Sequence, residues 1–335
     1  MKLIYLLVIL PLLVHSSAYA QVIEATATYT HDSQFKRKEY SSNISQKFYL
    51  NEKQSHSLAV NLQSGYSDVE RTSNDTSIIQ VWDNLDYISQ KSGGLNLTLD
   101  LFKRYGFSIG QNRGFSQINS DTTQSFGLYA WFLKETIQIA VNQSRTNSKQ
   151  IAIDTIDRDA FRVITPTSID GISRNINILA LLSTTTIGET SFTEIKRSDR
   201  PIAKLYTLGG KQYFTAINGA LHSKISLYEN LGEIQPLTLQ GQTIAQSIDT
   251  QWLQRVSDKY IVSVGYRAYF EDESPRAENA DDVSRASDTI YGRLTFRNYE
   301  NVWSHPATEY YAFGTNYKNS DGVRATSWGL GLRIN

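Results

Sequence analysis

Residues 260–270 read YIVSVGYRAYF, and this stretch decides the fold class. Every second residue in it is apolar: Tyr260, Val262, Val264, Tyr266, Ala268 and Phe270. The residues between them include Ser263, Gly265 and Arg267. Because successive side chains of a β-strand point to opposite faces, this period of two predicts a strand with one apolar face and one mainly polar or small face. The run is longer than a common strand of about five or six residues and matches the roughly 9–11 residues with which a tilted strand crosses a bilayer.

The same alternation recurs along the chain, at residues 58–62, 95–101, 137–141, 244–256 and 328–334. Polar sequences separate the alternating runs, and we expect turns at residues 51–54, 90–94, 218–219, 257–258 and 318–322. Short turns between consecutive strands favour antiparallel neighbours in an up-and-down order. No linker or shift in composition divides the chain, so residues 21–335 are expected to form a single domain. At about 20 residues for each strand and its turn, we expect about 16 strands, with roughly 14 to 18 possible.

Residues 1–20 are expected to be a cleaved signal peptide. Lys2 supplies a positive start, residues 3–14 are apolar apart from Pro11, and the segment ends in Ala18-Tyr19-Ala20. Small residues at the first and third positions of such a triplet suit a signal peptidase, which places the cut before Gln21. No later stretch is apolar over 18 consecutive residues, so transmembrane helices are not expected after this segment.

The composition excludes several classes of protein. The chain has no cysteine, which rules out a lipid-anchored lipoprotein, a disulfide scaffold and a thiolate metal site. It has 33 basic and 33 acidic residues, so no net field draws it to nucleic acid. Neither a phosphate loop nor a metal-ligand spacing occurs. We therefore expect no cofactor, no metal and no nucleic-acid partner.

Alternating strands suit both a soluble β-sandwich and a membrane barrel, and aromatic residues help to separate the two. Several of them fall near the ends of the expected strands: Tyr49, Tyr66, Trp82, Tyr105, Tyr291, Tyr299, Trp303, Tyr310 and Tyr317. In a membrane barrel such rings lie at the membrane–water interface. In a soluble β protein they would belong to the core or its rim.

The C-terminal residues favour the barrel. Trp328, Leu330, Leu332 and Ile334 alternate with small or polar residues up to the last position, Asn335. This tail resembles the C-terminal β-signal of bacterial outer-membrane proteins, which the barrel assembly machinery reads, although an aromatic residue is usual at the last position. The resemblance implies the outer membrane of a Gram-negative bacterium, with outer-membrane lipid, lipopolysaccharide and the assembly machinery as partners. The expected fold is an all-β, transmembrane, antiparallel up-and-down β-barrel, whose closure leaves no unpaired strand edge in hydrocarbon.

If the apolar faces contact lipid, the opposite faces line the lumen of the barrel. This assigns nine charged residues to the lumen: Lys47, Asp100, Lys224, Asp249, Arg255, Arg267, Arg293, Arg297 and Arg333. A charge on the lipid side would cost about 2–4 kcal/mol near the midplane. An arginine-rich lumen wall favours anionic or polar solutes, whereas an arginine–carboxylate network merely braces the barrel. Both interpretations stay open at this point.

These features support three functions. The first is a porin-like channel for small polar or anionic solutes. The second is a structural or assembly component of an outer-membrane export system for polysaccharide or protein. The third is a lipid hydrolase, because His31-Asp32-Ser33 resembles the His-x-Ser element of outer-membrane phospholipase A. That resemblance implies a serine nucleophile, Ser33, activated by His31. In that family Asn-Gly follows the serine, whereas Gln34-Phe35 follows Ser33 here. We therefore do not expect an enzyme.

Overall fold

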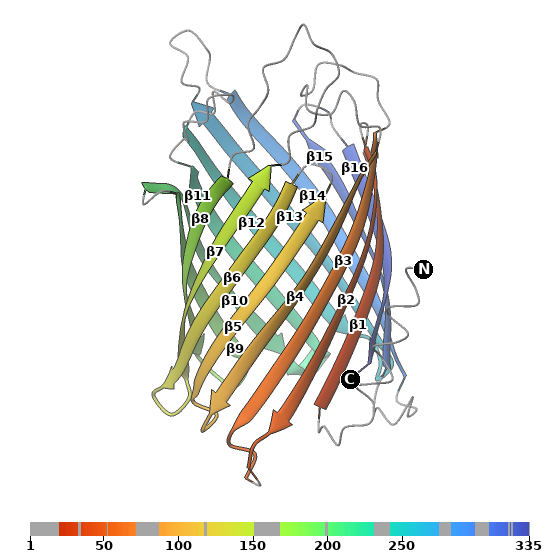
Figure 1. The fold of residues 1–335 in the computed structure, drawn as a ribbon. Coiled ribbons are helices and arrows are strands. Elements are labelled where there is room, and N and C mark those ends of the chain that lie inside the picture. The colour runs from red at the N-terminus through yellow and green to blue at the C-terminus, as the bar shows by residue number, and fades with distance from the viewer. Residues whose placement is uncertain are drawn as a thin grey trace, which may run out of the picture.

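A computed structural model describes residues 20–32, 35–51, 53–71, 87–116, 119–150, 168–197, 200–230, 242–274, 283–298, 308–320, 322 and 324–334. These residues form 16 antiparallel strands in one sheet, which closes into a barrel where the first strand pairs with the last (Figure 1). The predicted fold class and strand number are therefore confirmed. Among the described residues, no helix is long and apolar enough to cross a membrane.

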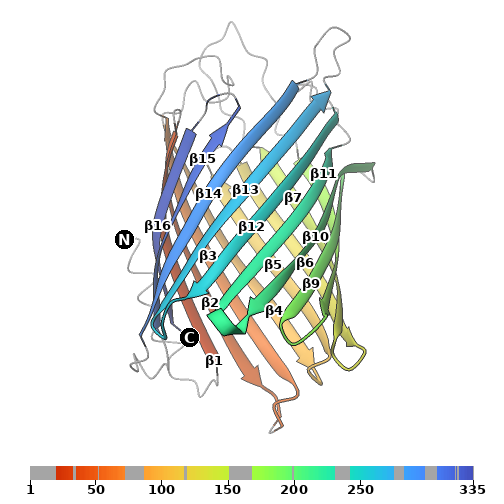
Figure 2. The same ribbon diagram turned by 180° about the vertical axis from the view of Figure 1, so that it is seen from behind.

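The strands are β1 (Ala20–Asp32), β2 (Phe35–Tyr49), β3 (Ser57–Arg71), β4 (Tyr87–Leu101), β5 (Tyr105–Ser116), β6 (Asn119–Phe132), β7 (Ile137–Gln150), β8 (Ser168–Leu181), β9 (Thr186–Arg197), β10 (Arg200–Phe214), β11 (Gly219–Asn230), β12 (Gln242–Arg255), β13 (Tyr260–Ser274), β14 (Val283–Asn298), β15 (Thr308–Asn319) and β16 (Arg324–Ile334). A short 3-10 turn, η2 (Thr215–Ile217), lies between β10 and β11. Each strand from β2 to β15 pairs with the strands before and after it in the chain, and β1 and β16 close the barrel by pairing with each other. All strands are tilted in the same sense around the barrel (Figures 1 and 2).

The two ends of the barrel differ in their connections. β1 begins and β16 ends at the end drawn lowest in Figure 1, which we call the turn end. Short connections join the strands there, including residues 102–104, 133–136, 182–185, 215–218 and 256–259. At the opposite end, which we call the loop end, the connections include the longer segments 72–86, 151–167 and 231–241.

Four of the five predicted turns lie at the junctions between strands, and three of them contain a residue with positive φ. Gln54 has φ 52° before β3, Asn218 has φ 52° before β11, and Gly322 has φ 83° before β16. The turn predicted at residues 90–94 is wrong, because these residues lie inside β4. Gly94 there serves close packing, since a Cβ on it would lie 1.5 Å from Oδ1 of Asn112 on β5. A glycine pair thus indicated a turn although the chain uses it to bring neighbouring strands together.

The large apolar side chains lie on the outside of the barrel. Ile225, Val264 and Leu330 each lie near the middle of a strand and are 56%, 55% and 59% exposed. The buried hydrophobic residues are few and mostly small: Ala203, Ala220, Ala245, Tyr311 and Ile334. This distribution reverses that of a water-soluble domain, which buries its large apolar side chains.

The alternate side chains face inward. Tyr311 of β15 donates a hydrogen bond to Oε1 of Glu24 on β1 at 2.7 Å, although β16 lies between these two strands. A contact that spans a strand in this way forms on the concave side of a curved sheet. Register then assigns every other described residue to one face, because directly paired residues share a face.

An aromatic belt surrounds part of the turn end on the outer face. Ring centroids lie 5.6 Å apart in Phe214–Trp252, 5.3 Å in Tyr260–Phe296 and 6.3 Å in Phe296–Tyr310. These residues lie close to the turn-end termini of β10, β12, β13, β14 and β15. Such a belt is typical of the boundary of an apolar band.

The residues predicted for such belts divide into three groups. Tyr66, Tyr105 and Tyr310 lie on the outer face. Tyr49, Tyr291 and Tyr317 lie on the inner face, so their prediction is wrong. Trp82, Tyr299 and Trp303 lie outside the described residues. Nearness to a strand end therefore does not predict that an aromatic residue faces the membrane, because the face that a residue occupies changes with every step along the strand.

Candidate functional site in the barrel lumen

The register places all nine charged residues of the expected lumen wall on the face opposite the exposed apolar side chains. They fall into two regions of the barrel. Lys47 and Asp100 lie on β2 and β4, and the others lie on β11 to β16. Arg255 is the last residue of β12 and pairs at 2.7 Å with Asp258 in the following turn, so it lies at the rim of the turn end.

Acidic side chains neutralise several of the inward cations. Nζ of Lys47 lies 3.4 Å from Oδ2 of Asp100. Nε of Arg297 lies 2.7 Å from Oε1 of Glu309 on the adjacent strand β15. Closer to the mouth at the loop end, Arg37 and Glu39 of β2 pair at 2.5 Å. The charges of the lumen wall are thus distributed as pairs rather than as a field of one sign.

Asp249 of β12 is at the centre of the most connected group. Its Oδ2 accepts hydrogen bonds from Nε and Nη2 of Arg267 at 2.8 and 2.5 Å, and its Oδ1 accepts one from the hydroxyl of Tyr291. Lys224 stands directly opposite Asp249 on β11 but forms no ion pair with any described residue. Glu189 of β9 lies on the same face, across Gly209 from Lys224, so two cations and two carboxylates lie at this level.

Two further arginines lie on strands β14 and β16. The guanidinium of Arg293 stacks over the ring of Tyr311 at 3.6 Å from its centroid, and its Nε donates to Oγ1 of Thr295 at 3.2 Å. Arg333 lies between Glu24 and Glu309 in the register of β1, β16 and β15. Aromatic contact and neighbouring carboxylates both lower the effective positive charge of this part of the wall.

Three tyrosines brace the wall by lying across a glycine of the neighbouring strand, and we call these arrangements tyrosine brackets. In the first, Tyr129 of β6 crosses Gly106 of β5 and donates to Oδ1 of Asp100 on β4 at 2.5 Å. A Cβ on Gly106 would lie 1.9 Å from Cε1 of Tyr129. The other two brackets are Tyr291 over Gly265 to Asp249, and Tyr311 over Gly331 to Glu24.

The sequence alone does not predict these brackets. Glycines at inward positions were visible in the alternation, but a bracket joins three strands. Which glycine lies beneath which tyrosine depends on the register of the sheet. Only the two carboxylates Asp100 and Asp249 were already singled out, as charged lumen residues.

The opposite part of the lumen wall, on β5 to β8, is almost free of charge. Among the inward-facing strand residues described there, Asp121 is the only charged one. The others are mainly amides and hydroxyls, including Ser108, Asn112, Thr123, Ser125, Asn142, Ser144, Thr146, Ser173, Asn175 and Asn177. We call this surface the amide–hydroxyl wall. Some of its members bond to neighbours, as Thr123 does to Thr146 at 2.9 Å and Asn175 to Thr193 at 2.7 Å.

The remaining predicted site residues lie on the outer face or beyond the described residues. Trp328, Leu330, Leu332 and Ile334 share the outer face of β16, which closes the barrel against β1. His31 is exposed on the outer face near the loop end of β1. Ser33 lies outside the described residues. Within the described part of the chain, no cluster of three His, Asp or Glu side chains is arranged to hold a metal ion.

The combination of a closed 16-strand sheet, an apolar outer face and a polar inner face decides the class of fold. This chain is an outer-membrane β-barrel by fold. No family model and no curated protein matches its sequence.

Solved structures of outer-membrane barrels resemble this barrel. CdiB from Acinetobacter baumannii matches with a TM-score of 0.57 and 8% identity over 93% of this chain and 60% of that chain. The barrel therefore spans only about three fifths of the length of CdiB. A bacterial polysaccharide outer membrane secretin matches with a TM-score of 0.56 and 7% identity, covering 96% of this chain and 99% of that chain. The outer membrane protein OpdK from Pseudomonas aeruginosa matches with a TM-score of 0.52 and 6% identity, covering 94% of this chain and 97% of that chain.

Proposed function

We propose that the barrel is inserted in the outer membrane of a Gram-negative bacterium and acts as a channel for small polar solutes, with little preference for charge. The observation that carries this proposal is the composition of the inner face. Most inward arginines and lysines of the expected site contact a carboxylate or an aromatic ring, and the amide–hydroxyl wall lies across from them. A barrel of about 16 strands is wide enough for an aqueous lumen in known porins.

The ion pairs between inward cations and carboxylates narrow the polar or anionic solutes expected from the sequence to uncharged polar ones. An arginine-rich wall attracts anions only as far as its charge is uncompensated, and Asp249, Glu309 and Asp100 compensate three of the cations. Amides and hydroxyls offer both donors and acceptors, which suit neutral polar molecules. Small uncharged polar solutes are therefore the favoured cargo, ahead of anions.

Purified protein in planar lipid bilayers tests this proposal. We expect discrete conductance steps and a reversal potential close to zero in a salt gradient. Well-folded protein that gives no steps would contradict a channel, and a strongly anion-selective current would contradict the role given to the ion pairs.

The Asp249–Arg267 pair provides a sharper test of the conducting path. Asp249→Asn removes a negative charge from the lumen wall and should move selectivity toward anions, whereas Arg267→Gln removes a positive charge and should move it toward cations. One unit charge about 10 Å from a permeating ion in water changes its energy by about 0.4 kcal/mol, which corresponds to about a twofold change in permeability ratio. The measurement is the reversal potential of each variant.

Arg174→Gln is the matched control, because Arg174 is a cation on the outer face of β8 and should not affect selectivity. If neither variant of the Asp249–Arg267 pair shifts the reversal potential, ions do not pass this part of the lumen.

The connections at the two ends of the barrel and residues 1–20 bear on its orientation in the membrane and on its export. We propose that residues 1–20 direct export and are removed, that the turn end faces the periplasm and that the loop end faces the exterior. Membrane fractionation combined with gel mobility of boiled and unboiled samples tests the location. Recovery in a soluble periplasmic fraction would overturn it.

The outer face of β16 is proposed to carry the assembly signal, through Trp328, Leu330, Leu332 and Ile334. Asn335 then occupies the position where such signals usually end in an aromatic residue. Asn335→Phe is expected to shorten the half-time of barrel assembly in cells about twofold or more, as measured by the appearance of the heat-modifiable form in a pulse-chase experiment. Equal half-times for both proteins would remove the last position from the signal.

The second candidate function is a component of an export system. The similarity in fold to a polysaccharide outer membrane secretin covers nearly all of both chains, and the amide–hydroxyl wall suits a neutral saccharide chain. Such a component should co-purify with a periplasmic partner and give no conductance on its own, which separates it from a channel.

The third candidate, a lipid hydrolase, has the least support. His31 is exposed on the outer face, where lipid would reach it, but Ser33 lies outside the described residues. Phospholipase activity that disappears in Ser33→Ala would establish the hydrolase, and activity equal in both proteins would dispose of the assignment.

A further inference from the structure

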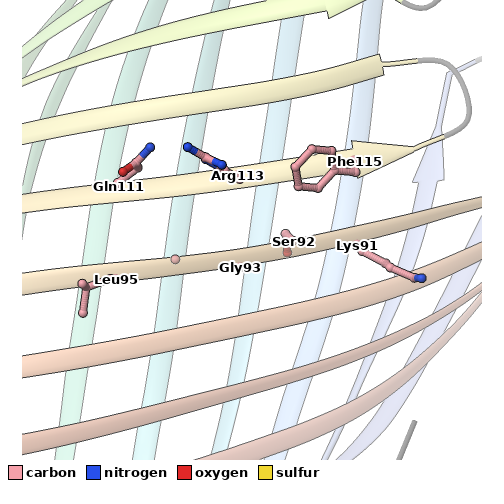
Figure 3. Close-up of a pocket in the computed structure, with 8 residues that line it drawn as sticks. Lys91, Ser92, Gly93, Leu95, Gln111, Arg113 and Phe115 are labelled. Atoms are coloured by element: carbon pink, nitrogen blue, oxygen red, sulfur yellow. The ribbon is translucent and has the colours of Figure 1, made fainter. Parts of the chain in front are cut away.

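The outer face of the barrel carries one cation on each of the neighbouring strands β4 and β5, and their side chains extend away from each other (Figure 3). Lys91 stands directly opposite Phe115, and Arg113 stands directly opposite Gly93. A hollow of about 490 Å³ lies between these side chains. Figure 3 shows Lys91, Gly93 and Leu95 along β4, with Arg113 and Phe115 along the neighbouring strand β5.

The hollow exists because Gly93 has no side chain. A Cβ on Gly93 would find its nearest neighbour, the carbonyl oxygen of Gln63, at 3.8 Å, which is an ordinary contact distance. No neighbouring side chain therefore requires a glycine here, in contrast to Gly94, where a Cβ would collide with Asn112. Gly93 leaves outward space between two cations without serving the packing of the sheet.

Within the described part of the chain, no carboxylate neutralises either cation. Lys91 and Arg113 are exposed and form no ion pair with any described residue. On the lipid side of a barrel, a cation costs about 2–4 kcal/mol at the midplane but only about 0–1 kcal/mol near the interface. Arg113 lies three residues before the loop-end terminus of β5, and Lys91 four residues after that of β4, which suits the level of lipid headgroups.

An apolar track continues from the hollow toward the turn end. Leu95 lies next to Gly93 on the outer face of β4, flanked by Leu62 on β3, and Ile109 follows on β5. All three are exposed, at 42%, 37% and 44%. A molecule with an anionic head at Arg113 and an apolar tail along Leu95 would match both surfaces.

We propose that the hollow around Gly93 binds a phosphate of an outer-leaflet glycolipid, the phosphorylated lipid A of lipopolysaccharide, with an acyl chain along Leu95 and Ile109. The guanidinium of Arg113 offers paired donors that fit a phosphate, and Lys91 adds a second positive charge. Phe115 supplies an aromatic surface at the headgroup level. This inference rests on the proposed insertion in the outer membrane and is independent of channel activity.

Native mass spectrometry of the detergent-purified barrel tests the site, with bisphosphorylated lipid A and phosphatidylcholine as probes. We expect Lys91→Gln combined with Arg113→Gln to lower the affinity for lipid A about tenfold or more, since each charge-assisted contact contributes on that order. Phosphatidylcholine binding should not change. Arg174→Gln removes another outward cation, on β8 and outside the lining of this hollow, and it should retain the affinity of the unmodified protein.

A second variant tests the shape of the site with both charges kept. Gly93→Leu fills the hollow without a backbone clash and should also lower lipid A affinity about tenfold. Its heat-modifiability on a gel verifies that the barrel is intact. Unchanged affinity in this variant and in the double variant would overturn the proposal.

Two further measurements separate other occupants. An excess of inorganic phosphate should not displace lipid A, and displacement would show a site for free phosphate instead. The mass of the oligomer should be the same in all variants, whereas a change caused by Lys91 and Arg113 would assign this face to a second copy of the chain and overturn the lipid site. Loss of conductance with intact lipid A binding would contradict only the channel.

Discussion

Replacing Ile225 with arginine is expected to lower the free energy of unfolding by about 2–4 kcal/mol in a lipid bilayer. Ile225 lies in the middle of β11, on the outer face, and is 56% exposed. In hydrocarbon its replacement by a charge removes favourable lipid contact and desolvates the guanidinium. The measurement is equilibrium unfolding in urea of the protein inserted in phospholipid vesicles.

Ser226→Arg is the matched control. Ser226 is the next residue of β11, and its side chain lies on the inner face, opposite Thr207 and Ser247. The same substitution there places the charge in a polar lumen and should change the unfolding free energy by less than about 1 kcal/mol. In a barrel exposed to water, Ile225→Arg would be neutral or stabilising instead. Equal effects of the two substitutions would contradict the membrane location.

Gly106→Ala is expected to destabilise the barrel by about 2–4 kcal/mol, which is large for the addition of one methyl group. The new Cβ would overlap the ring of Tyr129, whose Cε1 lies 1.9 Å from that position. The ring must move away, so its hydrogen bond to Asp100 is broken and an inward carboxylate loses a partner. Urea unfolding and the temperature at which the heat-modifiable form is lost both measure the effect.

Gly114→Ala, on the same strand and the same face, is the control for this substitution. The nearest atom to a Cβ on Gly114 is Nε2 of Gln90 at 3.8 Å, so alanine fits there. Its smaller unfolded-state entropy should make this variant neutral or more stable by about 0.4–1 kcal/mol. If the two variants have the same stability, the tyrosine bracket contributes nothing to the free energy of unfolding. Tyr129→Phe should then also leave that free energy unchanged.

The residues that alternate in the sequence show how much of the fold was predictable. The run at 260–270 indicated a strand, its length and its two faces, and the structure has β13 over Tyr260–Ser274 with Arg267 on the inner face. The glycines at 93 and 94 misled the prediction, because glycine favours both turns and close strand contacts. The prediction that Tyr49 and Tyr317 lie at the membrane–water interface was wrong for a related reason. Nearness to a strand end does not determine whether a side chain lies on the outer or the inner face of the barrel.

The candidate site was predictable only as a set of residues. Alternation assigns Lys224, Asp249 and Arg267 to one face, but it does not say that Asp249 pairs with Arg267 rather than with Lys224. The outer hollow at Gly93 was not predicted either. It requires Lys91 and Arg113 to lie on neighbouring strands in the observed register.

The sequence by itself determined that this protein is built of long alternating strands, about 16 of them, with an apolar and a polar face. These are local properties, because the period of two is a consequence of backbone geometry within each strand. Only the tertiary structure decided which charges neutralise one another, which tyrosine lies on which glycine, and where two cations stand beside an empty space. Those contacts depend on register and closure, as the bond from Tyr311 to Glu24 across the β16 closure illustrates, and no local pattern specifies partners 287 residues apart.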